Sequence, residues 1–279
     1  MNKYIFLFFI TILIYSGSFA QDNQANFPKE AEYPEQMPHP VNFWIFIMAG
    51  QSNMAGRGIV EPQDTLPNPR ILTINLENKW IVAKEPLHLY QPKLTGLDCG
   101  VSFACELLKQ VDDSVVIGLV PCAVGGSPIQ AWLEDSVFNG VQLFSNFKEK
   151  AGMAMEYGEV KGILWHQGES DAFDDKIPVY KEKLEAVLGN MRKFMGDDSL
   201  SIIMGELGAY TRPEERQENW NKINAIIRQV PDDLNNCHVV PTNDLTSNPD
   251  FIHFNNVSQR KLGKRYADKF ISVNENQNR

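Results

Sequence analysis

A serine stands where an apolar stretch of the sequence ends, in a setting that suits a nucleophile. The stretch "VNFWIFI" (41–47) leads into "MAGQSNMAG" (48–56), in which Ser52 lies between Gln51 and Asn53. A serine hydroxyl attacks efficiently only when a base takes its proton and a third group orients that base. Ser52 is therefore either a nucleophile or an ordinary residue of a tight turn, and the other polar motifs must distinguish the two.

His253 is the histidine that best suits the role of this base. It follows Asp250 by three residues in "DFIH", a turn length that can bring a carboxylate to the imidazole Nδ1–H. Such a bond fixes the tautomer of the imidazole and stabilises its protonated form. The alternative is that Asp250 is a turn residue and His253 leads into the last helix. With Ser52 considered, we interpret the pair as general base and orienting acid.

An ester hydrolase also needs hydrogen-bond donors for the oxygen that becomes negative during acyl transfer. Gly125 and Gly126 follow an apolar run in "PCAVGGSP", and glycines let backbone N–H groups approach a substrate closely. Gln167 in "WHQGESD" offers a side-chain amide, and Ser52 offers its own N–H. The sequence thus predicts an oxyanion hole formed by Ser52, Gly126 and Gln167, although "VGGSP" could equally be a plain turn between strand and helix.

Glu169 and Asp171 add carboxylates beside His166 on one short segment. They could bind a metal, orient a base or hold the loop. A metal site needs several convergent ligands, and one short turn supplies them only weakly, so we predict no metal. Glu169 remains a candidate second acid for His253.

The motifs are carried by an alternation of strands and helices. Nearly continuous apolar runs, typical of strands covered on both faces, alternate with amphipathic stretches. The expected strands are 41–49, 114–120, 160–165, 200–207 and 237–241, and the expected helices are 101–110, 141–156, 178–195, 218–229 and 257–271. This order predicts a parallel five-stranded sheet with helices on both faces, whose carboxyl edge bears the motifs. Residues 57–97 look like an insertion with short extended pieces, and 41–279 is expected to be one domain.

The N-terminus is predicted to be a secretory signal peptide followed by a flexible leader. Residues 1–20 combine Lys3, a short apolar core and a small-residue cleavage site, and 21–40 is polar and rich in proline. The formal charge is −9, or −10 without residues 1–20. This charge gives no reason to bind nucleic acid, or a membrane once the signal is removed. We therefore expect an exported protein, periplasmic or extracellular.

Four cysteines, Cys99, Cys105, Cys122 and Cys237, are too few for a disulfide scaffold. An exported chain could pair them in three ways, or bury them as free thiols. The oligomeric state is likewise left open by the sequence.

Taken together, "GQSNMAGRG", "VGGSPIQAW", "WHQGESDA" and "DFIHFN" resemble the SGNH-type hydrolases, and within them the sialate O-acetylesterase-like and acetylxylan esterase group, carbohydrate esterase family six. The resemblance covers nearly all of residues 41–272. It implies a flavodoxin-like three-layer α/β/α sandwich and no metal or organic cofactor.

The resemblance also implies roles for individual residues. Ser52 would be the nucleophile, His253 the general base and Asp250 its main acid, with Glu169 as support or second acid. Gln167 would replace the asparagine that the wider superfamily uses in the oxyanion hole.

The function implied is hydrolysis of acetyl esters on sugars, of the acetylxylan or sialic acid type, through an acetyl-enzyme intermediate. Sugar-binding candidates are Gln51, Asn53, Arg57, Trp132 and the insertion, and Trp132 could equally be a core residue. Two alternatives stay open: a non-catalytic carbohydrate-binding homologue on the same scaffold, and an esterase for other short acyl esters.

Overall fold

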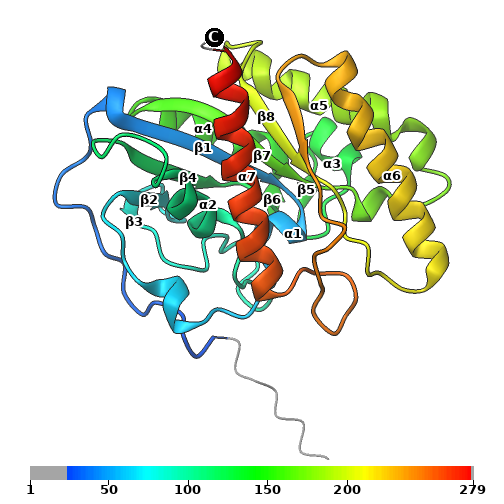
Figure 1. Ribbon diagram of the computed structural model, residues 1–279, viewed down its shortest axis with the longest axis horizontal. Helices are drawn as coiled ribbons and strands as arrows, with labels where there is room; N and C mark the ends of the chain where they lie inside the picture. The colour runs from blue at the N-terminus through cyan, green and yellow to red at the C-terminus, as the bar shows by residue number, and fades with distance from the viewer. Residues whose placement is uncertain (1–23, 278–279) are drawn as a thin grey trace, which may run out of the picture.

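The computed structural model describes residues 24–277, and its centre is a seven-stranded sheet (Figure 1). Its strands are β1 (Phe43–Gly50), β2 (Ile71–Ile74), β3 (Trp80–Val82), β4 (Val116–Pro121), β7 (Glu159–His166), β8 (Ser201–Gly205) and β9 (Cys237–Val240). The strand order is β3-β2-β4-β1-β7-β8-β9, and every neighbouring pair is parallel except β2 and β3.

All five predicted strands are present, but the sheet is larger than the predicted five strands. The two extended pieces of the insertion become β2 and β3, which extend the sheet beyond β4. The five predicted strands lie in the order β4-β1-β7-β8-β9. Numbered along the chain this is 2-1-3-4-5, which is the flavodoxin-like order. This order reverses direction at β1, so the carboxyl end of β1 lies at the topological switch point.

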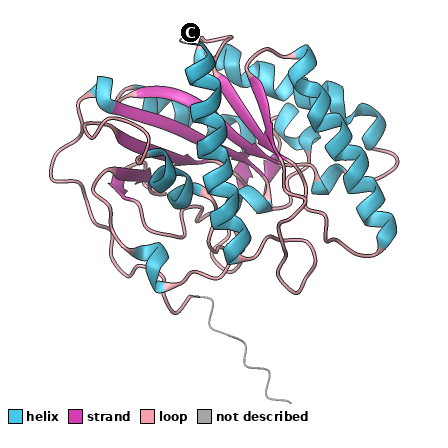
Figure 2. Cartoon of the chain, viewed as in Figure 1, coloured by secondary structure: helices cyan, strands magenta, loops and turns pink. Residues whose placement is uncertain are grey.

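Helices cover both faces of the sheet and complete the predicted three layers (Figure 2). The face packed against α2 (Gly100–Leu107) and α7 (Asn256–Gln277) receives Phe46 and Met48 of β1. The opposite face receives Phe43, Ile45, Ile47 and Ala49 of the same strand. The helices on that face are α3 (Ile129–Leu133), α4 (Leu143–Met155), α5 (Ile177–Met195) and α6 (Glu214–Asp233).

Alternation along β1 therefore explains its unbroken apolar sequence, because successive side chains enter different cores. Phe46 shows how one residue joins three elements. Its ring meets Phe103 of α2 and Phe270 of α7 edge-on, with centroids 4.7 and 4.8 Å apart. Burying a side chain of this size contributes about 1.5–3 kcal/mol.

The main differences from the predicted helices lie at their ends. Helix α6 begins at Glu214, four residues early, because Pro213 precedes it with extended backbone and two glutamates favour its first turn. Helix α4 begins after a short hairpin of β5 (Val137–Phe138) and β6 (Val141–Gln142). Neither change moves a predicted site residue.

The insertion folds back against the rest of the domain. Gly58 and Leu97 exchange backbone hydrogen bonds of 3.1 and 2.8 Å at its two ends. Arg260 of α7 pairs with Asp64 at 2.7 Å, in the short helix η2 (Pro62–Thr65). The insertion is thus closed at its two ends and held to α7 near its start.

The predicted leader is described from residue 24 onward and lies along the β3 edge of the sheet (Figure 1). Val82 N donates to Glu32 O at 2.7 Å, and Met37 packs against the core. It ends in η1 (Pro40–Asn42). The predicted signal peptide, residues 1–20, lies outside the described residues.

Two further features concern the whole described chain. Cys99, Cys105, Cys122 and Cys237 are all free thiols. No helix within residues 24–277 is long and apolar enough to cross a membrane.

Candidate active site

A pocket of about 530 Å³ opens at the carboxyl ends of β1, β4 and β7. Ligands of open parallel sheets bind at this edge, beside the topological switch point. Ser52, Gly126 and Glu169 come from the loops after these three strands, and His253 comes from the loop before α7. The structure therefore brings four of the sequence motifs into one cavity.

The turn after β1 fixes the position of Ser52. Gly50 has φ +129°, and a side chain there would place a Cβ 2.1 Å from His166 O. Only glycine fits this contact, which also lets Gln51 N donate to His166 O at 2.9 Å. Ser52 then begins the short helix α1 (Ser52–Ala55) and lines the pocket.

Ser52, His253 and Asp250 form a continuous hydrogen-bonded line. Ser52 Oγ lies 3.0 Å from His253 Nε2, and His253 Nδ1 lies 2.7 Å from Asp250 Oδ2. Asp250 Oδ1 accepts from the backbone N–H of Ile252 and His253 at 2.9 and 3.0 Å. Although partial burial opposes ionisation, these bonds and the imidazole hold the pKa of Asp250 below its ordinary value. The carboxylate is thus kept ionised beside the base.

Glu169 is adjacent to this line without joining it. Both ring nitrogens of His253 are already bonded, to Ser52 and Asp250, so none remains for a second acid. Glu169 Oε1 instead accepts from Asn53 Nδ2 at 2.5 Å and lies 3.4 Å from His166 Nε2. Burial alone would raise the pKa of Glu169, but His166 and Asn53 lower it below its ordinary value.

Asn53 connects Glu169 to the loop that carries the base. Its Nδ2 also donates to Ile252 O at 3.1 Å, and its Oδ1 accepts from Phe254 N at 2.9 Å. These two bonds hold the backbone on either side of His253. Asn53 is fully buried, so the structure makes it a support for that loop and not the sugar contact that the sequence predicted.

Gly126 presents its backbone N–H on a peptide held at several points. Gly125 N donates to Gln91 Oε1 at 3.0 Å, and Gly125 O accepts from Asn139 Nδ2 at 2.9 Å. Gly126 O accepts from Ser170 Oγ at 2.9 Å. Within residues 24–277 no protein group accepts from the N–H of Gly126. This N–H is therefore a free, fixed donor in the pocket.

The structure does not bring Gln167 into the pocket. Its side chain is fully buried, and its Nε2 donates to Asp171 Oδ2 at 2.6 Å and to Ser127 O at 3.3 Å. Burial raises the pKa of Asp171, whose Oδ2 also accepts from Ile129 N at the start of α3. The Gln167 amide, predicted as an oxyanion donor, therefore lies behind the pocket wall, because its hydrogen-bond partners lie in the interior.

Gln51 occupies the layer between Gln167 and the pocket. Its Oε1 accepts from Gln167 Nε2, Gly168 N and Ser170 N at 3.2, 3.4 and 3.2 Å. Its Nε2 has no acceptor among the described residues, yet it is not sealed from solvent. Since Gln51 lines the pocket, this amide group is the part that faces the cavity.

Arg57 and Trp132, both predicted sugar contacts, lie in different places. Arg57 lines the pocket, with NH2 donating to Gln91 Oε1 at 2.6 Å. No carboxylate of the described chain lies within 4.0 Å of it, and burial lowers its pKa to about 10. Trp132 is fully buried against Trp165 and donates to Ser127 Oγ at 2.9 Å, so it is a core residue.

Several lining residues were not identified from the sequence. Gln91 and Leu94 come from the insertion, whereas Phe173, Arg216 and Trp220 follow β7 and β8. None of them belongs to a motif with recognisable spacing. For Gln91 and Leu94, the sequence offered only one indication, namely that the insertion was expected to contact the sugar.

Metal binding has no support among residues 24–277, where no group of three or more His, Cys, Asp or Glu side chains could hold an ion. The residues lining the pocket are instead hydrogen-bond donors, one imidazole, apolar groups and the single carboxylate of Glu169.

A mostly parallel sheet between two helical layers, with polar loops gathered at its carboxyl edge, is the fold of the SGNH hydrolases. Comparison with known sequences is more specific. The family model "Carbohydrate esterase, sialic acid-specific acetylesterase" matches residues 42–272. The chain belongs to this carbohydrate esterase family and is an esterase, which confirms the resemblance inferred from the motifs.

Individual relatives agree with this assignment. A probable carbohydrate esterase from Arabidopsis thaliana is 32% identical over 267 residues, covering 88% of this chain and 96% of the relative. The solved structure of an Arabidopsis thaliana protein matches with a TM-score of 0.72 at 30% identity, covering 84% of this chain and 99% of that one.

Two more distant structures share the fold. NanS matches with a TM-score of 0.71 at 17% identity, covering 86% of this chain and all of its own. A carbohydrate acetylesterase from Xanthomonas citri matches with a TM-score of 0.61 at 21% identity, covering 81% of this chain and 55% of its own.

Proposed function

We propose that this esterase is an exported carbohydrate O-acetylesterase that cleaves acetyl esters of sugars through a serine nucleophile. The observation that carries the proposal is the line from Ser52 Oγ through His253 to Asp250, with links of 3.0 and 2.7 Å. Membership of the carbohydrate esterase family supports the substrate class.

In the first step, Ser52 Oγ bonds to the acetyl carbonyl carbon while His253 Nε2 takes the hydroxyl proton. The ionised Asp250 stabilises the imidazolium that results. The tetrahedral intermediate then collapses, the bond from carbon to sugar oxygen breaks, and His253 returns the proton to that oxygen. Acetyl remains on Ser52.

The negative oxygen of the intermediate needs donors that are already in position. The N–H groups of Ser52 and Gly126 fit this role, because neither has a protein acceptor in the described part of the chain. We assign the third donor to Gln51 Nε2, in place of Gln167, whose amide is engaged in the interior.

In the second step, a water molecule gives a proton to His253 and attacks the acetyl carbon. The bond to Ser52 Oγ breaks, the proton passes from His253 to that oxygen, and acetic acid leaves and gives its own proton to solvent as acetate.

Arg57 favours an acidic sugar as substrate. A guanidinium that is largely buried without a carboxylate partner is costly unless a ligand supplies the counter-charge. The exposed Arg216 adds a second cation to the same pocket. Among the acetylated glycans that the family suggests, those carrying carboxylates, such as sialic acid, suit these side chains best.

The experiment compares wild type with Ser52→Ala and, as a control, Ser114→Ala, which changes an exposed serine before β4. Acetate release is measured on p-nitrophenyl acetate and on acetylated xylan and sialic acid. We expect Ser52→Ala to lower kcat by roughly 10³-fold or more, and Ser114→Ala to match wild type.

Full activity in Ser52→Ala would refute the serine mechanism. Glycan binding without labelling of Ser52 by an organophosphonate would favour the non-catalytic alternative, and faster cleavage of longer acyl esters would refute the acetylesterase assignment. Export is tested on the same preparation, because an exported chain should begin at Gln21 by intact mass.

A further inference from the structure

The catalytic pocket continues past His253 into a second cavity. This cavity has a volume of about 510 Å³ and shares Arg57, Leu94 and His253 with the pocket that contains Ser52. The imidazole and Arg57 therefore lie between two spaces of similar size. The mechanism described above uses only the first of them.

The geometry of ester cleavage determines which part of the substrate occupies each cavity. The acetyl carbon must meet Ser52 Oγ, and the carbonyl oxygen must meet the N–H of Gly126. The sugar oxygen must lie at His253 Nε2 to receive its proton. The rest of the alcohol then extends over the imidazole, toward the second cavity.

We propose that the second cavity binds the sugar units adjoining the acetylated sugar, so that the enzyme acts on acetyl groups of a glycan chain in preference to free monosaccharides. This inference rests on the proposed acetylesterase function and names the form of its substrate.

The walls of the second cavity are fixed by hydrogen bonds. On one side, Asn248 Nδ2 donates to Arg57 O at 2.9 Å, and Asn248 N donates to His253 O at 2.7 Å. On the other side, Thr95 N donates to Gln91 O at 2.9 Å, and Thr95 Oγ1 donates to His88 O. The cavity is thus formed by two braced segments, one from the insertion and one from the loop of the base.

The lining suits a sugar ring with hydroxyl groups. Ile59 and Pro249 provide apolar surface, Asn248, Arg57 and Lys93 provide donors, and Asp250 provides a carboxylate. Lys93 is exposed, and no carboxylate of the described chain lies within 4.0 Å of its ammonium. Pockets lined by apolar surface with a few convergent polar groups are typical ligand sites.

The test measures kcat/KM on two series of mono-O-acetylated substrates, xylo-oligosaccharides and oligogalacturonides, each from one to four sugars. We expect kcat/KM to rise at least tenfold from one sugar to two or three in at least one series. Lys93→Trp, which fills the cavity mouth, should lower the ratio of trisaccharide to monosaccharide kcat/KM at least fivefold.

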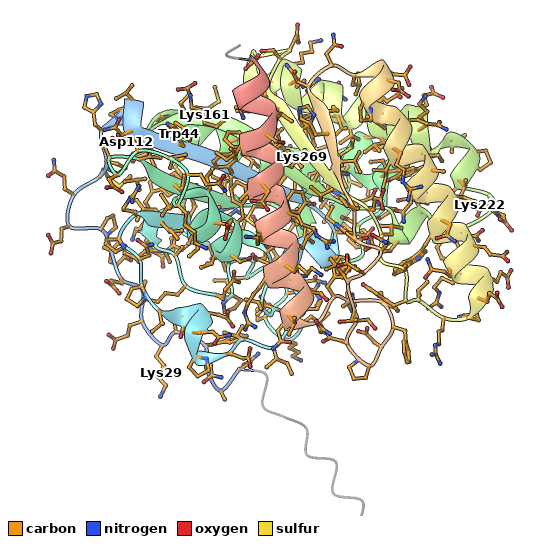
Figure 3. All side chains as sticks on the ribbon, viewed as in Figure 1. Lys29, Trp44, Asp112, Lys161, Lys222 and Lys269 are labelled. Carbon is orange, nitrogen blue, oxygen red and sulfur yellow. The ribbon has the colours of Figure 1, made fainter. Side chains whose placement is uncertain are left out.

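Lys29→Trp is the matched control, because Lys29 extends outward from the leader and does not line this cavity (Figure 3). It should leave that ratio as in wild type. Equal kcat/KM for all chain lengths, with p-nitrophenyl acetate still cleaved, would overturn the inference but leave the esterase function intact. A chain-length gain that Lys93→Trp does not alter would also overturn it. Loss of all ester cleavage in wild type would instead refute the proposed function.

Discussion

At the scale of single residues, His253, the proposed base, is held through its backbone as well as its ring. Asn53 bonds the carbonyl before His253 and the N–H after it, while Asp250 bonds the imidazole. Glu169 in turn accepts from Asn53. The two carboxylates therefore have separable roles, one on the ring and one on the loop.

Replacing each carboxylate by its amide should separate these roles. Asp250→Asn removes the charge that stabilises the imidazolium and should lower kcat by roughly 10³–10⁴-fold. Glu169→Gln can still accept from Asn53, so we expect a loss of about tenfold or less. Steady-state kinetics on p-nitrophenyl acetate would measure both. A larger loss in Glu169→Gln than in Asp250→Asn would assign the triad acid to Glu169.

The sequence could single out Ser52, Asp250 and His253, which the structure brings into contact, because local spacing and the preceding strand carry that signal. It could not determine which polar residues face the pocket. The side chains of Gln167 and Trp132 point inward, where they contact Ser127 O and Trp165, and those contacts join segments distant in sequence. Gln91 carries no local signal at all.

At the scale of elements, the insertion contains a buried acidic pair that the mechanism does not use. Burial, and then repulsion from Asp98, raise the pKa of Glu85 well above its ordinary value of 4.5. Asp98 Oδ2 also lies 2.8 Å from His88 Nδ1. The insertion, which contributes walls to both cavities, thus contains a carboxyl group for which ionisation in the folded protein is costly.

This raised pKa makes a pH-dependent contribution to stability. The contribution is fully present below about pH 4.5 and is lost as pH rises toward the folded-state pKa of Glu85. Glu85→Gln should remove it, so the difference in unfolding free energy between wild type and variant should change with pH. The slope should not exceed about 1.4 kcal/mol per pH unit.

Urea unfolding at several pH values between 4 and 8 measures this difference, with Glu156→Gln as a control at an exposed position at the end of α4. A pH-independent difference for Glu85→Gln would show that folding does not raise the pKa of Glu85.

Five of the strands and the layers were predictable because apolar runs and amphipathic periods reflect burial directly. The size of the sheet was not, because the insertion interrupts the alternation of strands and helices, so β2 and β3, four and three residues long, looked only like short extended pieces. Such short pieces acquire strand structure by pairing with β4 and with each other. That pairing is a tertiary effect.

At the scale of the whole molecule, the described leader covers the exposed edge of β3. The edge of a sheet offers unpaired backbone groups that can pair with other chains. Glu32 O accepts from Val82 N, and the polar, proline-containing segment continues past it to Met37. A polar, proline-containing composition, which predicted a flexible leader, therefore also suits a segment that covers the edge strand of the sheet.

Deleting residues 24–38 should lower the unfolding free energy by about 1–3 kcal/mol, from one lost backbone hydrogen bond and the partial burial of Met37. The control Glu32→Ala keeps the backbone bond and loses only the half-exposed ion pair with Lys84, so its effect should stay within about 1 kcal/mol. Thermal and urea unfolding measure both. An unchanged midpoint in the deletion variant would show that the leader does not stabilise the domain.

The division of the site between strand ends and insertion has a consequence for how such enzymes diversify. The candidate nucleophile Ser52 and the Gly126 N–H follow the central strands β1 and β4, whereas Gln91, Lys93 and Leu94 belong to the insertion. Gln91 also accepts from Gly125 N, so a change there would disturb the peptide that carries the Gly126 donor. Inherited changes at Lys93 and Leu94 can instead alter which esters fit the cavities while the residues after β1 and β4 stay the same.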